Sequence, residues 1–152
     1  MGDESLVEAL EREHREIDAG IEAYLRTADV EALQQAMSAL RRHVYLEEEF
    51  LFPPLREAGM FGPVMVMLRE HGELWNDLDA LTRMLGEGRG ADPATSACRT
   101  MLARLAAHNA KEEPIIYPQA GQVLSPEDTA ELHEFIRAGE LPAGWVCERA
   151  GA

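Results

Sequence analysis

The chain is poor in three kinds of residue: cationic side chains, aromatic side chains and cysteines. Its 14 Lys and Arg residues face 28 Asp and Glu residues, which gives a formal net charge of -14. This charge argues against nucleic acid or an anionic membrane as a partner, because both require a cationic surface. The two cysteines, Cys98 and Cys147, form no CxxC pair, which predicts a reducing, cytoplasmic setting.

Long apolar runs and strand patterns are also missing from the sequence. No apolar run is long enough to cross a membrane. The N-terminal residues 1–6 include Asp3 and Glu4 and do not resemble a signal peptide. A hydrophobic content of 46% in 152 residues is nevertheless enough for one domain with a real core. We therefore expect a single domain over residues 1–152 that folds without β-strands.

Apolar residues recur at helical spacing over four long segments of the chain. We predict long helices followed by a short one, over residues 4–26, 30–52, 63–85, 93–118 and 125–138. The expected fold class is therefore all-α, an up-down-up-down four-helix bundle over about residues 4–120. The short helix and a C-terminal tail occupy residues 121–152.

Prolines and glycines predict where these helices are interrupted. Pro53 and Pro54 are expected to end or kink the second helix, and Pro114 to kink the fourth, because proline removes a hydrogen bond and clashes with the preceding turn. Residues 86–93 are rich in glycine and are expected to form a loop. Trp145 is expected to pin the C-terminal tail to the bundle.

The sequence contains an internal repeat. Residues 43–53 and 108–118 both read His-x-x-x-Glu-Glu, one further residue, two apolar residues, an aromatic residue and a proline. Upstream of these copies, residues 12–17 and 69–74 share Arg-Glu-His-x-Glu followed by an aliphatic residue. Each half therefore predicts an αα-hairpin, and two such hairpins related by a pseudo-twofold axis make a bundle.

Each copy of the repeat places an imidazole and a carboxylate one helical turn apart on the same face. In a bundle core the candidate metal ligands from both halves can meet: His14, His43, Glu47, His71, His108 and Glu112. Six nitrogen and oxygen ligands are too many for one tetrahedral zinc ion, and they suit two metal ions that share carboxylate bridges. His133, on the short helix, is left out of the set.

A structural reading of the same residues is the alternative. A single inward histidine is more often a hydrogen-bonded core residue, and a glutamate one turn away is more often its surface partner. The joint pattern over four helices favours the metal site, because burying four imidazoles and two carboxylates without a metal or a dense hydrogen-bond network would cost several kcal/mol each.

At these motifs the chain resembles the hemerythrin family, and specifically the bacterial hemerythrin-like HHE domains, over about residues 4–120. The resemblance implies a non-haem di-iron centre with an oxo or hydroxo bridge. It also implies that the four histidines are terminal ligands and that Glu47 and Glu112 bridge the two irons. Manganese and zinc are the less favoured metals.

The chain departs from the oxygen-carrying hemerythrins one turn after the histidine of the third helix. Those proteins have a second histidine there, and this chain has Trp75. The equivalent position of the first repeat is Asp18, which could be an extra ligand, could accept a hydrogen bond from an imidazole, or could face solvent. Asp18 and Trp75 are therefore candidates for contact with the ligands. Glu13 and Glu70, which precede ligand histidines, are expected on the flanks of their helices.

Two classes of function fit this reading. The first is a di-iron protein that reacts with O2, peroxide or nitric oxide, in redox or stress protection or in iron handling. The second is a module that binds O2 reversibly, or senses iron or oxygen, without turnover. Fewer histidine ligands leave more coordination open to small molecules, which favours the first class. Tyr45, Tyr117 and Trp75 are expected to pack in the core, with electron transfer as the alternative.

Overall fold

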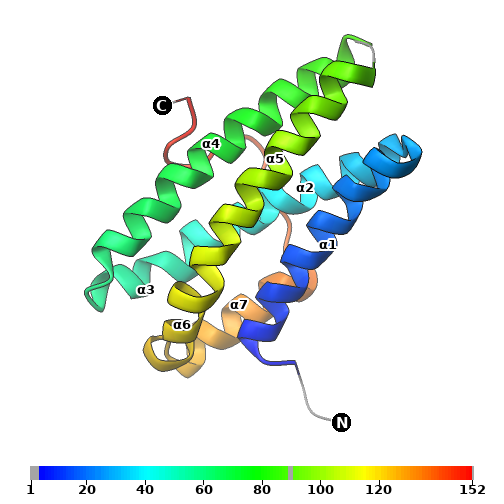
Figure 1. Ribbon diagram of the computed structural model, residues 1–152. Helices are drawn as coiled ribbons and strands as arrows, with labels where there is room; N and C mark the ends of the chain where they lie inside the picture. The colour runs from blue at the N-terminus through cyan, green and yellow to red at the C-terminus, as the bar shows by residue number, and fades with distance from the viewer. Residues whose placement is uncertain (1–3, 89–90, 152) are drawn as a thin grey trace.

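The computed structural model describes residues 4–88 and 91–151, and the regular secondary structure of these residues is entirely helical. In chain order the elements are α1 (Leu6–Thr27), α2 (Val30–Leu46), the π-helical turn η1 (Glu47–Leu51), α3 (Phe52–Glu57), α4 (Phe61–Gly86), α5 (Ala91–Lys111), the π-helical turn η2 (Glu112–Ile116), α6 (Tyr117–Val123) and α7 (Pro126–Ala138). The all-α prediction is confirmed, and the four long helices α1, α2, α4 and α5 pack together as a bundle (Figure 1). Residues 1–3 of the acidic N-terminal segment and residues 89–90 of the expected loop lie outside the described residues.

Capping residues define the hairpin of α1 and α2. The Ser5 hydroxyl accepts a hydrogen bond from the Glu8 N–H (3.1 Å), and the Glu8 carboxylate accepts one from the Ser5 N–H (3.0 Å). Ala28 ends α1 with a left-handed φ of 56°, and Asp29 then caps α2 by accepting a hydrogen bond from the Ala32 N–H. Because only two residues separate the helices, α2 folds back along α1.

Helical structure continues beyond both of the boundaries predicted at the repeated motifs. After α2 the chain passes through η1 into α3, and this helical stretch ends at Glu57 rather than at residue 52. After α5 the chain passes through η2 into α6, and this helical stretch ends at Val123 rather than at residue 118. Both interruptions are π turns, and each closes with a hydrogen bond that spans five residues, from the first residue of α3 to Glu47 and from the first residue of α6 to Glu112.

The prolines explain why the helices are interrupted but not ended. One residue separates Pro53 and Pro118 from the π turn before each of them. Both prolines therefore fall in the first turn of a new α-helix, where a backbone N–H has no hydrogen-bond partner within that helix. Pro114 lies inside η2. There the wider turn relieves the clash between a proline ring and the carbonyl group four residues earlier.

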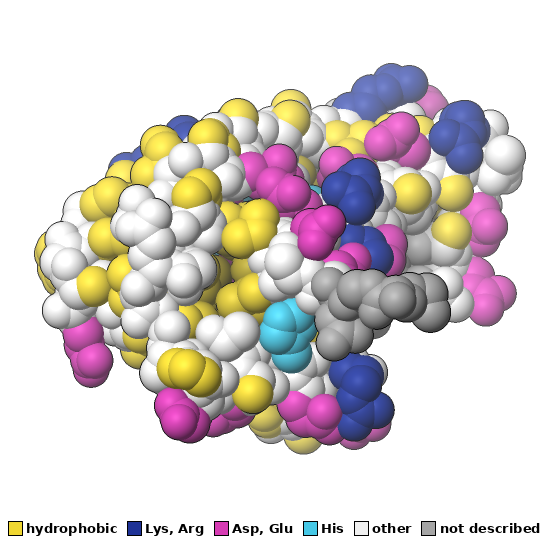
Figure 2. Space-filling view, turned by 90° about the horizontal axis from the view of Figure 1, so that it is seen from below, with side chains coloured by type: hydrophobic (Ala, Val, Ile, Leu, Met, Phe, Trp, Pro, Cys, Tyr) yellow, Lys and Arg dark blue, Asp and Glu magenta, His cyan; other side chains and the backbone are white. Residues whose placement is uncertain are grey.

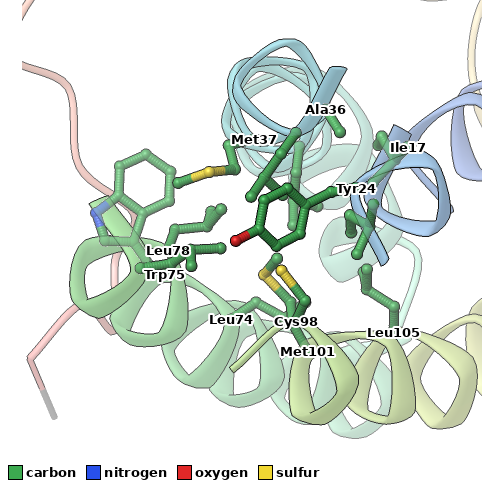
Figure 3. Packing of buried hydrophobic residues seen from close by; sticks show 14 of the residues in the cluster. Ile17, Tyr24, Ala36, Met37, Leu74, Trp75, Leu78, Cys98, Met101 and Leu105 are labelled. Carbon is green, nitrogen blue, oxygen red and sulfur yellow. The ribbon is translucent and has the colours of Figure 1, made fainter. Parts of the chain in front are cut away.

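Two apolar clusters enclose a layer of polar side chains. On α1, Leu10 belongs to one cluster and Ile17 to the other, with His14 between them. On α4, His71 has the same position between the clusters. In the cluster that contains Ile17, the ring of Tyr24 lies among side chains from α2, α4 and α5 (Figure 3). The polar layer is therefore closed off from solvent along the bundle axis on both sides.

The tail that follows α7 returns to the bundle and packs on α4. The ring of Trp145 contacts Tyr45 (centroids 5.1 Å apart) and Trp75 (5.5 Å), in agreement with its expected anchoring role. A Cβ atom on Gly72 of α4 would lie 2.5 Å from the carbonyl oxygen of Arg149. The glycine therefore permits the close approach of tail and helix.

The surface carries both signs of charge. On the face shown in Figure 2, acidic and basic side chains are interspersed around a gathering of hydrophobic side chains. No helix in the described part of the chain is long and apolar enough to cross a membrane.

Gly20 sets the spacing between α1 and α2. A Cβ atom there would lie 2.7 Å from the Cβ of Ala36 and 2.9 Å from the carbonyl oxygen of Ala32. We expect Gly20→Ala to lower the free energy of unfolding by about 1–2 kcal/mol, because overpacking outweighs the gain in helix propensity. Chemical denaturation measures the change. Gly121→Ala is the control, since no atom lies near its added Cβ in α6; equal stability of the two variants would contradict the spacing role.

Candidate metal centre

The six side chains expected as ligands converge in the polar layer of the bundle. Their ligand atoms form two sets, each within 4.8 Å: His14, His43, Glu47 and Glu112 (the His14 group), and Glu47, His71, His108 and Glu112 (the His71 group). All six residues are buried, with relative exposures of 5% or less. Each group takes its two histidines from one half of the repeat, and the groups share both glutamates.

The shared glutamates lie where α-helix gives way to π turn. Glu47 is the first residue of η1, and Glu112 is the first residue of η2. The histidine one turn earlier contacts each of them: His43 Nε2 lies 3.3 Å from Glu47 Oε2, and the matching distance from His108 Nε2 to Oε2 of the other glutamate is 3.4 Å.

Each shared glutamate also reaches a histidine of the opposite half. Glu47 Oε1 lies 3.0 Å from His71 Nε2. Glu112 Oε1 lies 3.1 Å from His14 Nε2. Because each carboxylate touches both groups, both are placed to bridge two ions.

A second set of glutamates contacts Nδ1, the ring nitrogen that faces away from the centre, of each of the four candidate histidine ligands. The Nδ1 contacts are His14 with Glu113 (2.7 Å), His43 with Glu13 (2.8 Å), His71 with Glu48 (2.8 Å) and His108 with Glu70 (2.9 Å). In each pair the carboxylate comes from a different helical segment than the imidazole. Each of these glutamates is also the sequence neighbour of one of the six predicted ligands. Each of these helical segments therefore supplies a candidate ligand, and the glutamate beside that ligand orients a histidine of a neighbouring helix.

This arrangement corrects the expectation for Glu13 and Glu70, which do not lie on the flanks of their helices. Glu13 and Glu70 are buried, at 8% and 9% exposure, and face the histidine of a neighbouring helix. Glu48 and Glu113 were not singled out from the sequence at all. The signal was present as the repeated Glu-Glu and Glu-His pairs, because adjacent helical residues point about a quarter-turn apart and can face two neighbours.

The contacts between Nδ1 and the carboxylates determine which ring nitrogen of each histidine faces the centre. An Nδ1 that donates to a carboxylate leaves Nε2 free to offer its lone pair inward. His14 Nε2 and His43 Nε2 lie only 3.1 Å apart. Two lone pairs at that distance repel unless a positive charge lies beside them. Among the described residues no group donates a hydrogen bond to the buried Oε2 of Glu112 either. The donor set therefore fits metal cations.

The pKa shifts of the buried histidines and glutamates also indicate that positive charge stabilises this layer. Burial lowers the pKa of His108, but the neighbouring carboxylates of Glu112 and Glu70 outweigh burial and raise it to about 10. Burial opposes ionisation of Glu112, yet His108 keeps the pKa of this carboxyl well below its usual range. Burial also opposes the charged form of His43, whose pKa Glu47 nevertheless raises. Protons or metal ions can provide the charge that these groups require.

Tyr117 reaches into the centre, where core packing was expected. Its ring is fully buried, and its hydroxyl lies 2.6 Å from Glu47 Oε2 and 2.9 Å from Glu112 Oε1. The same hydroxyl lies 2.9 Å from His14 Nε2 and 3.1 Å from His43 Nε2. Burial, followed by the charges of Glu112 and Glu47, raises the pKa of Tyr117 well above its usual value. The neutral phenol therefore donates a hydrogen bond to the shared carboxylates.

The model of a protein family described as Hemerythrin HHE cation binding domain matches residues 5–120. The chain belongs to this family. The match covers the bundle and all six candidate ligands, and it confirms the resemblance seen in the sequence. Comparisons with curated proteins and with solved structures give no significant match.

Three other residues considered from the sequence lie outside both groups of this hemerythrin domain. Asp18 is half-buried, and burial raises its pKa; among the described residues it is not bonded to a histidine. Trp75 is buried in the apolar cluster, with the Arg41 guanidinium over its ring at 4.6 Å. His133 lies on α7 and is only half-buried. The role of Asp18 or Trp75 beside the ligands stays a prediction.

A small cavity of about 10 Å³ adjoins the centre of the hemerythrin domain. Its lining residues are His14, Ile17, Leu40, His43, Val44, Glu47, His71, Leu74, Leu105, His108 and Asn109. It is large enough for one water-sized molecule. Apart from the residues of the two groups, the walls are apolar except for Asn109, whose Oδ1 is buried without a partner among the described residues.

The outer carboxylates are expected to set metal affinity in this hemerythrin domain. The hydrogen bond from His108 holds the pKa of Glu70 at about 2, so Glu70 carries a full charge beside that imidazole at neutral pH. We expect Glu70→Gln to weaken metal binding by about 10-fold, because the histidine loses a charged acceptor that raises its basicity. Competition with a coloured chelator measures affinity. Glu16→Gln, whose carboxylate is exposed and contacts Arg12, is the control; an equal affinity in both variants would contradict the role of Glu70.

Proposed function

We propose that the chain holds a non-haem di-iron centre that reacts with O2, peroxide or nitric oxide, in redox or stress protection or in iron handling. The metal ligands are the six residues of the two groups: His14, His43, Glu47, His71, His108 and Glu112. The observation that carries the proposal is the inward-facing set of four Nε2 atoms around two shared carboxylates.

The donor set supports iron. Each group offers two imidazole nitrogens and two carboxylate oxygens, and no thiolate takes part. Imidazole and carboxylate suit iron, manganese and zinc alike, and membership of a cation-binding hemerythrin family favours iron. Four protein donors for each ion leave coordination positions for small molecules. Manganese and zinc remain the less favoured metals.

The cavity supports a small, uncharged reactant. Its volume of about 10 Å³, about that of one water-sized probe, favours a diatomic molecule or peroxide over an organic substrate. Ile17, Leu40, Val44, Leu74 and Leu105 form its apolar walls. Walls of this kind exclude bulk water from the centre, which strengthens electrostatic interactions inside it.

The side chains around the ions have separate tasks in this proposal. The bound irons supply one-electron redox chemistry at positions open to the reactant. The outer glutamates keep each imidazole oriented, and Glu47 and Glu112 hold the two ions together. The Tyr117 hydroxyl lies at the edge of the centre, 2.6 Å from Glu47 Oε2. Catalysis or binding would thus proceed within fixed ligands rather than by movement of a loop.

A reversible O2-binding or sensing module is the second candidate. The apolar walls favour it, because excluding water also protects a bound oxygen molecule from release as a reduced product. The two candidates differ in what an oxidant does. An enzyme consumes peroxide or nitric oxide over many cycles, whereas a carrier returns to its starting state when O2 is removed.

Metal analysis and absorption spectroscopy of the same sample test the proposal. Protein loaded anaerobically with ferrous iron is expected to hold two irons per chain and to gain near-ultraviolet absorption on exposure to air. Addition of peroxide or nitric oxide is then expected to give turnover. One iron or none per chain would refute the di-iron centre, and reversal on removing O2 without turnover would favour the carrier.

Variants separate the centre from incidental histidines. Replacing both Glu47 and Glu112 with Ala is expected to abolish binding of the two ions, because the bridging carboxylates are lost. Circular dichroism establishes whether the variant remains helical. His133→Ala is the control and is expected to keep both irons, since His133 lies outside the two groups.

A further inference from the structure

The two halves of the centre differ in one oxygen atom. Tyr117 follows η2 and stacks on His14, with ring centroids 5.4 Å apart and planes at 28°. Phe52 follows η1 and stacks on His71 at the same distance, with planes at 26°. The aromatic rings therefore occupy matching positions in the two repeats. The phenolic oxygen has no equivalent beside the His71 group.

The phenolic oxygen lies beside all four donors of the His14 group. Its four neighbours are His14 Nε2, His43 Nε2, Glu47 Oε2 and Glu112 Oε1, at 2.6–3.1 Å. These are one atom from each member of that group. The ring is fully buried and stacks on His14 of α1, which holds the oxygen beside the centre.

We propose that Tyr117 is a fifth protein donor to the ion of the His14 group. This inference rests on the proposed di-iron centre. The phenol would lose its proton to solvent as a ferric ion binds, because a bound cation favours the anionic form of the donor. The ion of the His71 group then has fewer protein donors, and it is the one that stays open to an external molecule.

Tyr117 does not line the cavity that adjoins the centre. The cavity lining includes the four histidines and Glu47 but neither Tyr117 nor Glu112. An external molecule in the cavity would therefore meet the four histidines and Glu47 rather than the phenol. Tyr117 would anchor one ion while the other reacts.

Spectra of the ferric protein test this role. The wild type is expected to hold two irons and to show a visible phenolate-to-iron charge-transfer band, with phenolate vibrations in its resonance Raman spectrum. Tyr117→Phe introduces the side chain that the other half already carries, and it is expected to lose the band completely. Tyr45→Phe is the control and should keep it, because Tyr45 packs against Phe50 and Trp145.

The outcomes separate this inference from the proposed function. Two irons in the wild type with no visible band, or an unchanged band in Tyr117→Phe, would overturn the fifth donor and leave the di-iron centre standing. A wild type without two irons would overturn both.

A different set of contacts concerns residues 126–151, which we call the C-terminal segment. It lies beyond the 5–120 match to the family. The Glu148 N–H donates to Glu48 Oε1 (3.0 Å), and the other oxygen of Glu48 lies 2.8 Å from His71 Nδ1. One carboxylate therefore joins the backbone of the C-terminal segment to a histidine of the His71 group.

Arg42 makes a second connection. Its guanidinium donates to the carbonyl oxygens of Phe135 (2.5 Å), Ile136 (2.6 Å) and Gly139 (2.9 Å), at the C-terminal end of α7. It also donates to Glu13 Oε2 at 3.1 Å. The other oxygen of that carboxylate contacts Nδ1 of the histidine that follows Arg42 in sequence, at 2.8 Å.

We infer that the C-terminal segment positions the metal centre, acting on His71 through Glu48 and on His43 through Arg42 and Glu13. These are positioning residues, since none of them is among the six ligands. One outer carboxylate, that of Glu48, is thus held by a residue outside the family match, and that of Glu13 is held by Arg42, whose guanidinium binds carbonyl oxygens outside the match. This inference also rests on the proposed metal centre.

A backbone substitution tests the contact with Glu48. Glu148 is exposed and is the second residue of a turn closed by the Ala150 N–H and the Cys147 carbonyl oxygen (3.2 Å), a position that suits proline. Glu148→Pro removes the donating N–H together with the exposed side chain. We expect one of two irons, that of the His71 group, to pass to a chelator about 10-fold faster.

Glu148→Ala is the matched control, because it loses the same side chain but keeps the N–H. It is expected to release iron at the wild-type rate. Equal rates in the two variants, or equal acceleration of both irons, would overturn the positioning role. A wild type that never holds two irons would instead overturn the proposed function.

Discussion

The centre depends on the contact between each histidine Nδ1 and a carboxylate. This contact fixes the orientation of four imidazoles, so that four Nε2 atoms face inward beside Glu47 and Glu112. The outer carboxylates come from neighbouring helical segments, which makes the helices mutually dependent. The pKa values of His43 and His108 are raised and that of Glu112 is lowered, which favours cationic imidazoles beside an anionic carboxylate, and a pair of cations could supply the same positive charge.

The repeat makes the centre nearly symmetric, and the deviation from symmetry is chemical rather than architectural. The sequence comparison placed that deviation at Asp18 and Trp75, neither of which belongs to the two groups. In the structure it lies at Tyr117 and Phe52, whose rings stack on equivalent histidines. A single hydroxyl thus distinguishes two otherwise similar environments, and a two-metal site with unlike positions can hold one ion and expose the other.

The C-terminal segment shows how residues outside a family motif can act on its centre. The tail and α7 contain none of the six candidate ligands, but they hold Glu48 directly and Glu13 through Arg42. Gly72 permits this arrangement by letting the backbone at Arg149 approach α4. Interactions of this kind tune a metal site through ligand orientation while leaving its composition unchanged.

The sequence by itself determined the all-α class, the internal repeat and the candidate ligands, because helical periodicity and the spacing of His43 from Glu47 are local properties. Tertiary structure decided the rest. The π turns depend on how the helices continue past Pro53 and Pro118, which a local rule treats as a kink or an end. The roles of Glu13, Glu48, Glu70, Glu113 and the Tyr117 hydroxyl depend on which neighbour each side chain meets. Such contacts join residues up to 103 positions apart, and no spacing within one helix specifies them.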